Sequence, residues 1–247
     1  MSQKQKITDI RTGPSAGTGR RALLRGALLA GVTVMTGAQI SGCSSSPGGG
    51  SAPAATRTTG RPAPSGTPGQ RVLLAYFSRP GENYYYGGRT TLRTGNTEVL
   101  ARMISERIAC DVHRIKAVDP YPVDYEETVA RNVREQEGDA RPAIAELPDS
   151  IDQYGTVLLA SPIWNVRAPM IMSTFTDAFD FSGKTVLPVT TYAMSGLGTT
   201  ERDYADSCPG ATIGEGLAVR GEEVRKAGAD VESWLRRVRL PLPPGRP

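Results

Sequence analysis

The 247-residue sequence contains one histidine and three cysteines. A single histidine, His113, gives poor support to a metal site built from several histidines or to a Ser/His/Asp catalytic triad. It falls in an apparent edge strand, where a solvated or packed side chain is the simplest interpretation. The apolar run over residues 26–40 is short and rich in glycine, so we do not expect a comfortable membrane span from it.

The sequence has little excess charge once its first residues are set aside. The formal net charge is +4, from 29 basic and 25 acidic residues. Six of the basic residues and one acidic residue precede Cys43, which leaves 23 and 24 in the rest of the chain. The remainder is therefore near neutral, and nucleic-acid binding is not expected.

The excess of basic residues lies in an N-terminal segment that has the features of an export signal. "GRRALLR" resembles a twin-arginine export signal, and "ISGC" (40–43) resembles a bacterial lipobox in which Cys43 is acylated and becomes the new N-terminus. Residues 1–43 are thus predicted to be a lipoprotein signal, and the protein to be lipid-anchored on the extracytoplasmic face of a bacterial membrane. An uncleaved apolar anchor and an unprocessed tail are the alternatives.

Residues 44–70 are mostly Ser, Pro, Gly, Thr and Ala and show no periodicity. Such a segment cannot bury enough apolar area to offset its chain entropy, so it is predicted to be a disordered tether.

From residue 71 onward, apolar runs alternate with amphipathic ones, as in an α/β protein. Buried strands are predicted over 71–78, 156–163 and 185–192, an edge strand over 111–118 and a last strand over 211–219. Helices are predicted over 97–109, 124–136, 168–179, 199–207 and 222–238. These elements predict one three-layer domain over 71–240, followed by a tail over 241–247. Cys110 and Cys208 then lie near opposite sheet edges, so a disulfide between them is not expected.

In open α/β sheets, ligands bind at the carboxyl ends of the strands, which selects three loops here. The first ends in "RTGNTEVL", which places Thr94, Gly95, Asn96 and Thr97 at a helix N-terminus. Free backbone N–H groups, the helix dipole and two hydroxyls there could hold a phosphate, although "TGNT" is also an ordinary helix cap. It is not a Walker loop, because no Gly-Lys-Ser/Thr follows.

The other two loops could hold a flat ring. In "SPIW" (161–164), Trp164 follows a buried strand and could present its indole face to an aromatic ligand, with simple core packing as the alternative. "YAMSGLG" (192–198) supplies small residues where a ring edge would meet backbone N–H and C=O groups.

Taken together, "LLAYFSR…TGNTEVLA", "LLASPIWNVRAPMIMSTF" and "VTTYAMSGLGTTERD" resemble the three cofactor loops of the flavodoxin-like family. The resemblance covers 71–238 and implies a five-stranded parallel sheet of order 2-1-3-4-5 that binds FMN. It implies a phosphate loop of Ser78, Thr94, Gly95, Asn96 and Thr97, flanked by Arg79 and Arg93. It implies a second loop of Pro162, Ile163, Trp164 and Asn165, and a third of Thr191, Tyr192, Met194, Ser195, Gly196 and Gly198.

The sequence departs from the family pattern in the first loop. "RPGENYYYGGRTTLR" separates Ser78 from Thr94, where the family runs almost directly from serine into Thr-Gly-Asn-Thr. We expect the loop ends to meet and the insert to project over them, bending at Gly81 and at Gly87–Gly88. Tyr84, Tyr85 and Tyr86 would form part of a wall beside the flavin, or a self-packed surface loop.

The expected function is FMN-dependent electron transfer by an exported, membrane-tethered protein. The electrons would pass to a redox partner protein or a small quinone-like acceptor. Alternatives are an FMN-dependent NAD(P)H:quinone-type oxidoreductase, for which no nicotinamide site is recognisable, and a cofactor-free binding lipoprotein on the same scaffold. Further candidates for a substrate pocket are Tyr121, Tyr125, Asn132 and Arg134.

Overall fold

The computed structural model describes residues 71–240. The signal and Cys43, the tether over 44–70 and the tail over 241–247 lie outside these residues, and those expectations stay predictions. Within 71–240, the longest helices fall short of the length and apolarity that a membrane crossing requires.

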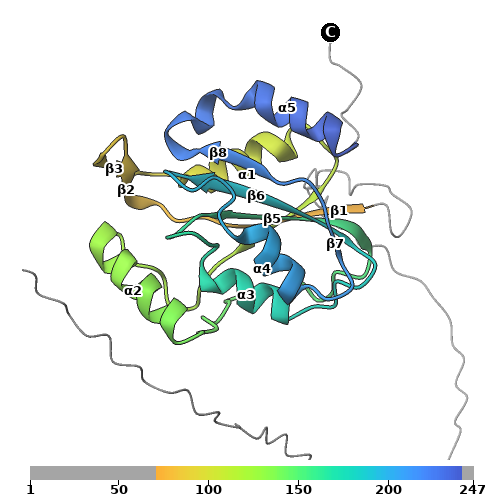
Figure 1. Ribbon diagram of the computed structural model, residues 1–247, viewed down its shortest axis with the longest axis horizontal. Helices are drawn as coiled ribbons and strands as arrows, with labels where there is room; N and C mark the ends of the chain where they lie inside the picture. The colour runs from red at the N-terminus through yellow and green to blue at the C-terminus, as the bar shows by residue number, and fades with distance from the viewer. Residues whose placement is uncertain (1–70, 241–247) are drawn as a thin grey trace, which may run out of the picture. The chain divides into compact units, whose positions relative to one another are not determined.

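A parallel sheet forms the centre of the domain (Figure 1). Its order is β4-β1-β5-β6, with β7 and β8 both pairing with β6 along its outer side. In chain order this is 2-1-3-4-5, as predicted. The strands are β1 (Arg71–Phe77), β4 (Asp111–Ile115), β5 (Tyr154–Pro162), β6 (Thr185–Tyr192), β7 (Thr212–Ile213) and β8 (Leu217–Arg220).

The fifth position in the sheet differs from the prediction of one strand over 211–219. Two short strands occupy it, separated by Gly214-Glu215-Gly216. Glycines weaken a strand because they have no side chain to pack. A Cβ at Gly216 would also lie 2.7 Å from the Leu197 side chain, so the chain passes close to the third loop at this point.

Helices cover both faces of the sheet (Figure 1). The chain forms α1 (Asn96–Ser105), α2 (Tyr125–Glu137), α3 (Met170–Asp177), α4 (Thr200–Ser207), a 3₁₀ helix η1 (Gly221–Lys226) and α5 (Gly228–Arg237). The predicted helix over 222–238 is therefore two pieces, a 3₁₀ turn and an α-helix.

The domain has two hydrophobic clusters, one on each face of the sheet, because side chains along β1 point alternately to the two faces. Leu74 and Tyr76 pack with α1 and α5, whereas Leu73 and Phe77 pack with α3 and α4. Successive strand side chains point to opposite faces, so a strand covered on both sides is apolar throughout. Cys110 lies in the first cluster and Cys208 in the second, so the sheet separates the two thiols.

The inserted segment is an antiparallel hairpin of β2 (Gly81–Tyr85) and β3 (Gly88–Leu92), set apart from the central sheet (Figure 1). Tyr86 and Gly87 form its two-residue turn with φ of 43° and 87°. Two positive φ values match the twist of the flanking strands, which is why a glycine stands there. Gly81 and Gly87 have positive φ, as suits the predicted bends, whereas Gly88 pairs with Tyr85 as the first residue of β3, and the strand pairing was not anticipated.

Candidate functional site

A cavity of about 220 Å³ lies at the carboxyl edge of the parallel strands. It brings together residues of all three predicted loops. From the predicted site, the lining residues are Ser78, Arg79, Asn96, Thr97, Pro162, Ile163, Trp164, Asn165, Thr191 and Tyr192. Residues of the three predicted loops thus lie around one cavity.

The first loop closes on itself despite the insert. Ser78 accepts a hydrogen bond at Oγ from the backbone N–H of Glu98 at 3.0 Å. A Cβ at Gly95 would lie 2.4 Å from both Ser78 Oγ and the Arg79 carbonyl oxygen, so only glycine allows this approach. The two ends of the loop therefore meet, as expected.

The N-terminus of α1 presents donors to the cavity. Gly95 is its N-cap and gives no side-chain cap, and the N–H groups of Asn96 and Thr97 have no partner within residues 71–240. Together with the helix dipole, these donors favour an anion. Thr97 is buried, and its Oγ1 lies 2.7 Å from Oγ1 of Thr191 at the end of β6.

Trp164 lines the cavity with its ring held from behind. Its indole makes edge contacts with Phe77, at 5.7 Å between centroids, and with Tyr121, at 5.0 Å. Such T-shaped contacts stabilise aromatic pairs and fix the ring in one orientation. Trp164 is both packed and exposed to the cavity, so the two interpretations of this residue are compatible.

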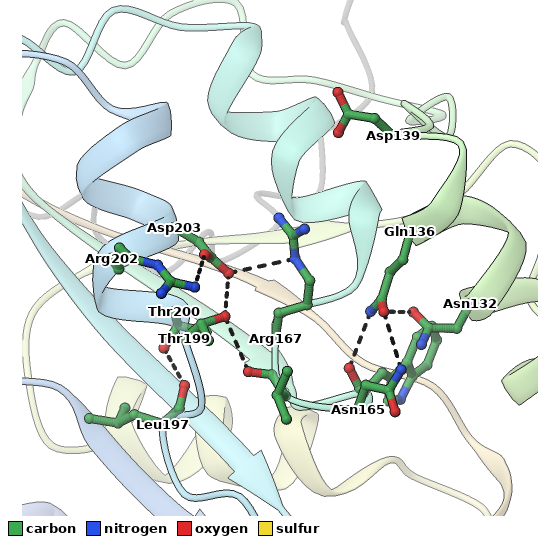
Figure 2. A network of polar contacts seen from close by, with 12 residues as sticks. Asn132, Gln136, Asp139, Asn165, Arg167, Leu197, Thr199, Thr200, Arg202 and Asp203 are labelled. Carbon is green, nitrogen blue, oxygen red and sulfur yellow. Dashed lines mark hydrogen bonds and ion pairs between the residues drawn. The ribbon is translucent and has the colours of Figure 1, made fainter. Parts of the chain in front are cut away.

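The loop around Trp164 is tied to α2 and to the third loop (Figure 2). On one side, Gln136 donates from Nε2 to the Trp164 carbonyl at 3.2 Å, and Asn165 donates from Nδ2 to Gln136 Oε1 at 3.3 Å. On the other, the Thr199 N–H donates to the Val166 carbonyl at 2.7 Å. Loops held on both sides are suited to position a ligand.

Other predicted residues of the third loop lie outside the cavity lining. Met194 is 76% exposed, while Gly196 and Gly198 have φ of 58° and 57° and shape the loop. Ser195 donates from Oγ to the Asn165 carbonyl at 3.2 Å and so joins the second and third loops. None of these four residues lines the cavity.

Arg79 lines the cavity but its guanidinium has other partners. It donates to the carbonyls of Pro122 and Val123 at 2.7 and 3.0 Å and to that of Glu82. Burial lowers the pKa of this guanidinium from its ordinary value. In the structure, Arg79 therefore anchors the hairpin and does not reach toward the α1 N-terminus. Arg93 is exposed, and neither Arg93 nor Thr94 lines the cavity.

The hairpin spans two sides of the cavity. Toward α2, Glu82 donates its N–H to the Val123 carbonyl at 2.8 Å, and the Arg89 guanidinium lies 3.6 Å from the centre of the Tyr125 ring. Toward η1, the Tyr86 N–H donates to Glu222 at 3.2 Å. Tyr84 lines the cavity, whereas Tyr85 and Tyr86 are exposed at the hairpin tip.

Helix α2 supplies a wall that the loop argument did not predict in full. Four residues were candidates for a substrate pocket. Of these, Tyr125 and Asn132 line the cavity. Arg134 is exposed and absent from the lining, and Tyr121 is buried behind Trp164. Thr128, Val129, Val133, Asn83, Ala193, Gly221 and Glu222 also line the cavity and were not predicted. The valines four residues apart in a polar helix were a signal, whereas nothing in the sequence marked Gly221 or Glu222.

His113 has a packing environment. Its ring stacks on Phe175 at 5.9 Å, and burial lowers its pKa. Across residues 71–240, His, Cys, Asp and Glu side chains form no group that could hold a metal ion.

The sheet order and the convergent loops define a flavodoxin-like α/β protein. Residues 90–238 match the sequence profile of the flavodoxin family, more than half of the 247-residue chain. The chain belongs to this family. A search of curated proteins finds no match.

The chain is also similar to several solved structures. A candidate flavoprotein from Bacteroides eggerthii is 26% identical, with a TM-score of 0.56, covering 69% of this chain and 99% of its own. A similar protein from Bacteroides uniformis is 26% identical, with a TM-score of 0.54 and coverage of 68% and 99%. A Lactobacillus acidophilus flavoprotein in complex with FMN is 18% identical, with a TM-score of 0.46 and coverage of 64% and 97%.

Membership of the flavodoxin family supports FMN as the cofactor. The residues present fit that group: a helix N-terminus with unused N–H donors suits its phosphate, and a held indole beside it suits its flat ring.

Proposed function

We propose that the protein binds FMN in this cavity and transfers electrons through it, as an exported protein tethered to a membrane. The observation that carries the proposal is the convergence of the three loops on one cavity beside the uncapped N-terminus of α1. The bound cofactor supplies the redox chemistry, while the protein binds and orients it.

The chain's own residues have distinct tasks in this proposal. The N–H groups of Asn96 and Thr97 hold the phosphate, and the hydroxyl of Ser78 fixes the start of α1. Trp164 provides a flat apolar surface for the ring. Thr191 and Tyr192 place the end of β6 at the ring edge.

Tethering is supported by the N-terminal sequence. The twin-arginine-like "GRRALLR" fits a folded, cofactor-loaded cargo, because that route carries folded proteins. A lipid on Cys43 would then keep the domain at the extracytoplasmic membrane face, within reach of a redox partner protein or a quinone-like acceptor.

The test is an absorbance spectrum of the freshly purified full chain. We expect flavin bands; a colourless protein that does not take up FMN at micromolar concentration would overturn the proposal. Bleaching by NADH without a partner reductase would instead identify an oxidoreductase. Mass spectrometry of the mature N-terminus tests acylation of Cys43 separately.

A further inference from the structure

The tip of the β2–β3 hairpin exposes two adjacent aromatic rings. Tyr85 and Tyr86 are 47% and 57% exposed, and their rings meet edge to face at 4.9 Å between centroids. The hairpin is separate from the central sheet and lies at one end of the domain (Figure 1). Two aromatic rings are therefore presented at an extremity of the domain, outside both of its hydrophobic clusters.

The backbone at Tyr86 is unfavourable for a tyrosine. Tyr86 and Gly87 are the two central residues of the turn, and Tyr86 has a φ of 43°. Bulky residues rarely adopt this left-handed region, and asparagine or aspartate normally precedes glycine in such a turn. The ring gains no contact with the core in return. The folding of the turn therefore does not account for an aromatic residue here, which directs attention to a contact outside the domain.

The hairpin holds the two rings in a fixed position. At its base, Arg79 donates to the Glu82 carbonyl, and the Glu82 N–H donates to the Val123 carbonyl at 2.8 Å. At its tip, the Tyr86 N–H donates to Glu222 at 3.2 Å. A segment that is already ordered loses less conformational entropy when it binds a surface, so even a small contact can be effective.

The size and charge of the tip favour a lipid surface over a protein. Two side chains cannot build the roughly 1,000 Å² that a stable protein interface buries. A tyrosine combines an apolar ring with a polar hydroxyl, and this combination places aromatic residues at the headgroup level of a bilayer. Glu222, Glu223 and Arg220 surround Tyr86 with mixed charge. Because bases are not in excess there, the contact should not depend on anionic lipid.

The N-terminal segment is long enough for the tip to reach a membrane that holds Cys43. Tyr86 lies 15 residues after Arg71, so the tip is no more than about 50 Å from the start of β1. The 27 residues between Cys43 and Arg71 can span up to about 90 Å. An anchor at Cys43 would also keep the tip at a high local concentration beside the bilayer, so a weak contact is sufficient.

We propose that Tyr85 and Tyr86 make a second, non-covalent contact with the headgroup region of the membrane to which the protein is tethered. This inference rests on the membrane tethering proposed above and goes beyond it, because an anchor alone leaves the orientation of the domain free. Tyr84, the preceding residue of β2, lines the cavity. The contact therefore orients the domain with the cavity close to the bilayer.

The test measures how close the tip lies to the lipid in phosphatidylcholine vesicles. The full chain is incorporated through its own N-terminal segment, and vesicle flotation measures attachment. A nitrobenzoxadiazole fluorophore is placed on Gly88→Cys, where an added Cβ makes only an ordinary contact at 3.6 Å. The control protein carries it on Asp152→Cys, an exposed position just before β5 at the opposite edge of the sheet. Cys110 and Cys208 are buried, and the parent chain measures background labelling.

A lipid-borne quencher should quench the fluorophore at position 88 about twofold or more beyond that at position 152. Tyr86→Asn should remove about half of this excess, and Tyr85→Ser/Tyr86→Asn should abolish it. Tyr86→Asn places asparagine before Gly87, the favoured sequence for this turn, so the midpoint of its urea unfolding should not fall below that of the parent. Lost quenching in a protein of equal or higher stability cannot be assigned to unfolding. Salt or added phosphatidylglycerol should leave the excess unchanged.

The outcomes separate this contact from the proposed function. A chain that does not float with vesicles overturns the tethering, and the tip contact with it. Attachment with equal quenching at the two positions overturns the tip contact alone and favours a protein partner for the two rings. Excess quenching that survives Tyr85→Ser/Tyr86→Asn, or that requires phosphatidylglycerol, also overturns it, since other residues would then make the contact. The absorbance spectrum of the same preparation tests FMN binding independently of these results.

Discussion

The hydroxyl oxygens of Thr97 and Thr191 lie 2.7 Å apart, both in buried side chains. The bond joins the first turn of α1 to the end of β6, and hence the first cofactor loop to the third. A shift of either element would break it, so it fixes the distance between the phosphate and ring ends of the proposed FMN site.

Substitution of this pair should be strongly non-additive. Thr97→Val or Thr191→Val alone leaves a buried hydroxyl without its partner and should cost about 1–3 kcal/mol in the free energy of unfolding. The double variant removes both hydroxyls and should cost less than the sum of the two. Urea unfolding of the four proteins measures this, with Thr90→Val in the hairpin as the control. Additive losses would show that the two hydroxyls do not interact.

Replacing Trp164 should affect both the affinity and the potential of the cofactor. Trp164→Ala removes the ring that rests on Phe77 and Tyr121, and FMN affinity should fall about tenfold or more. The reduction potential of the low-potential flavin couple should rise, because an aromatic neighbour disfavours the anionic reduced flavin. Trp164→Phe is the conservative control and should retain most of both properties. Fluorescence titration and potentiometry provide the measurements; an unchanged couple in Trp164→Ala would remove the indole from the ring contacts.

The central fold could be predicted because its signals are local. Strands such as β1 and β6 are continuous apolar runs, and the rule for parallel sheets then assigns the carboxyl edge as the ligand edge. That rule led to Asn96, Trp164 and Thr191, which do line one cavity.

The remaining parts of the site depend on tertiary contacts. The role of Arg79 follows from its hydrogen bonds to three carbonyls, two of them more than forty residues away in the sequence. Neither the charge nor the sequence position of Arg79 predicts these partners. Glu222 reaches the cavity only because β8 ends beside it. The hairpin pairs across a Tyr-Gly turn, which is a weaker signal than Asn-Gly or Asp-Gly.

Arg79 should act on stability more than on phosphate binding. Arg79→Met keeps the length of the side chain but removes every donor to Glu82, Pro122 and Val123, and should cost about 1–3 kcal/mol in unfolding free energy. Amide exchange in β2 and β3 should accelerate. Arg93→Met, at an exposed site, should stay within about 0.5 kcal/mol of the parent. A large loss of FMN affinity with unchanged exchange would instead assign Arg79 to the phosphate.

The stability of the domain should decrease in mild alkali through Cys208. Burial raises the pKa of this thiol to about 11 from its ordinary 9.0. Between these values the unfolded chain releases the proton while the folded chain retains it, so the contribution is complete below pH 9 and is lost as pH rises toward 11. The difference in unfolding free energy between the parent and Cys208→Ala should therefore narrow over this range. If the unfolding free energies of the parent and Cys208→Ala instead changed in parallel with pH, the raised pKa of Cys208 would be contradicted.

The hairpin should hold the cofactor in place, because it is fastened on both sides of the cavity. Arg79, Glu82 and Arg89 bind it to the start of α2, and Tyr86 binds it to Glu222 on η1. The loop ends already meet at Ser78 and Gly95, so removing residues 81–92 should leave the fold intact. The dissociation rate of FMN should rise, and the rate of its reduction should change, because Tyr84 no longer lines the site. Tyr85→Ser/Tyr86→Ser, which changes only the exposed tip, should leave both rates near the parent values. Stopped-flow measurements of release and reduction decide the matter: a deletion variant with both rates unchanged would make the hairpin a surface loop with no part in the site.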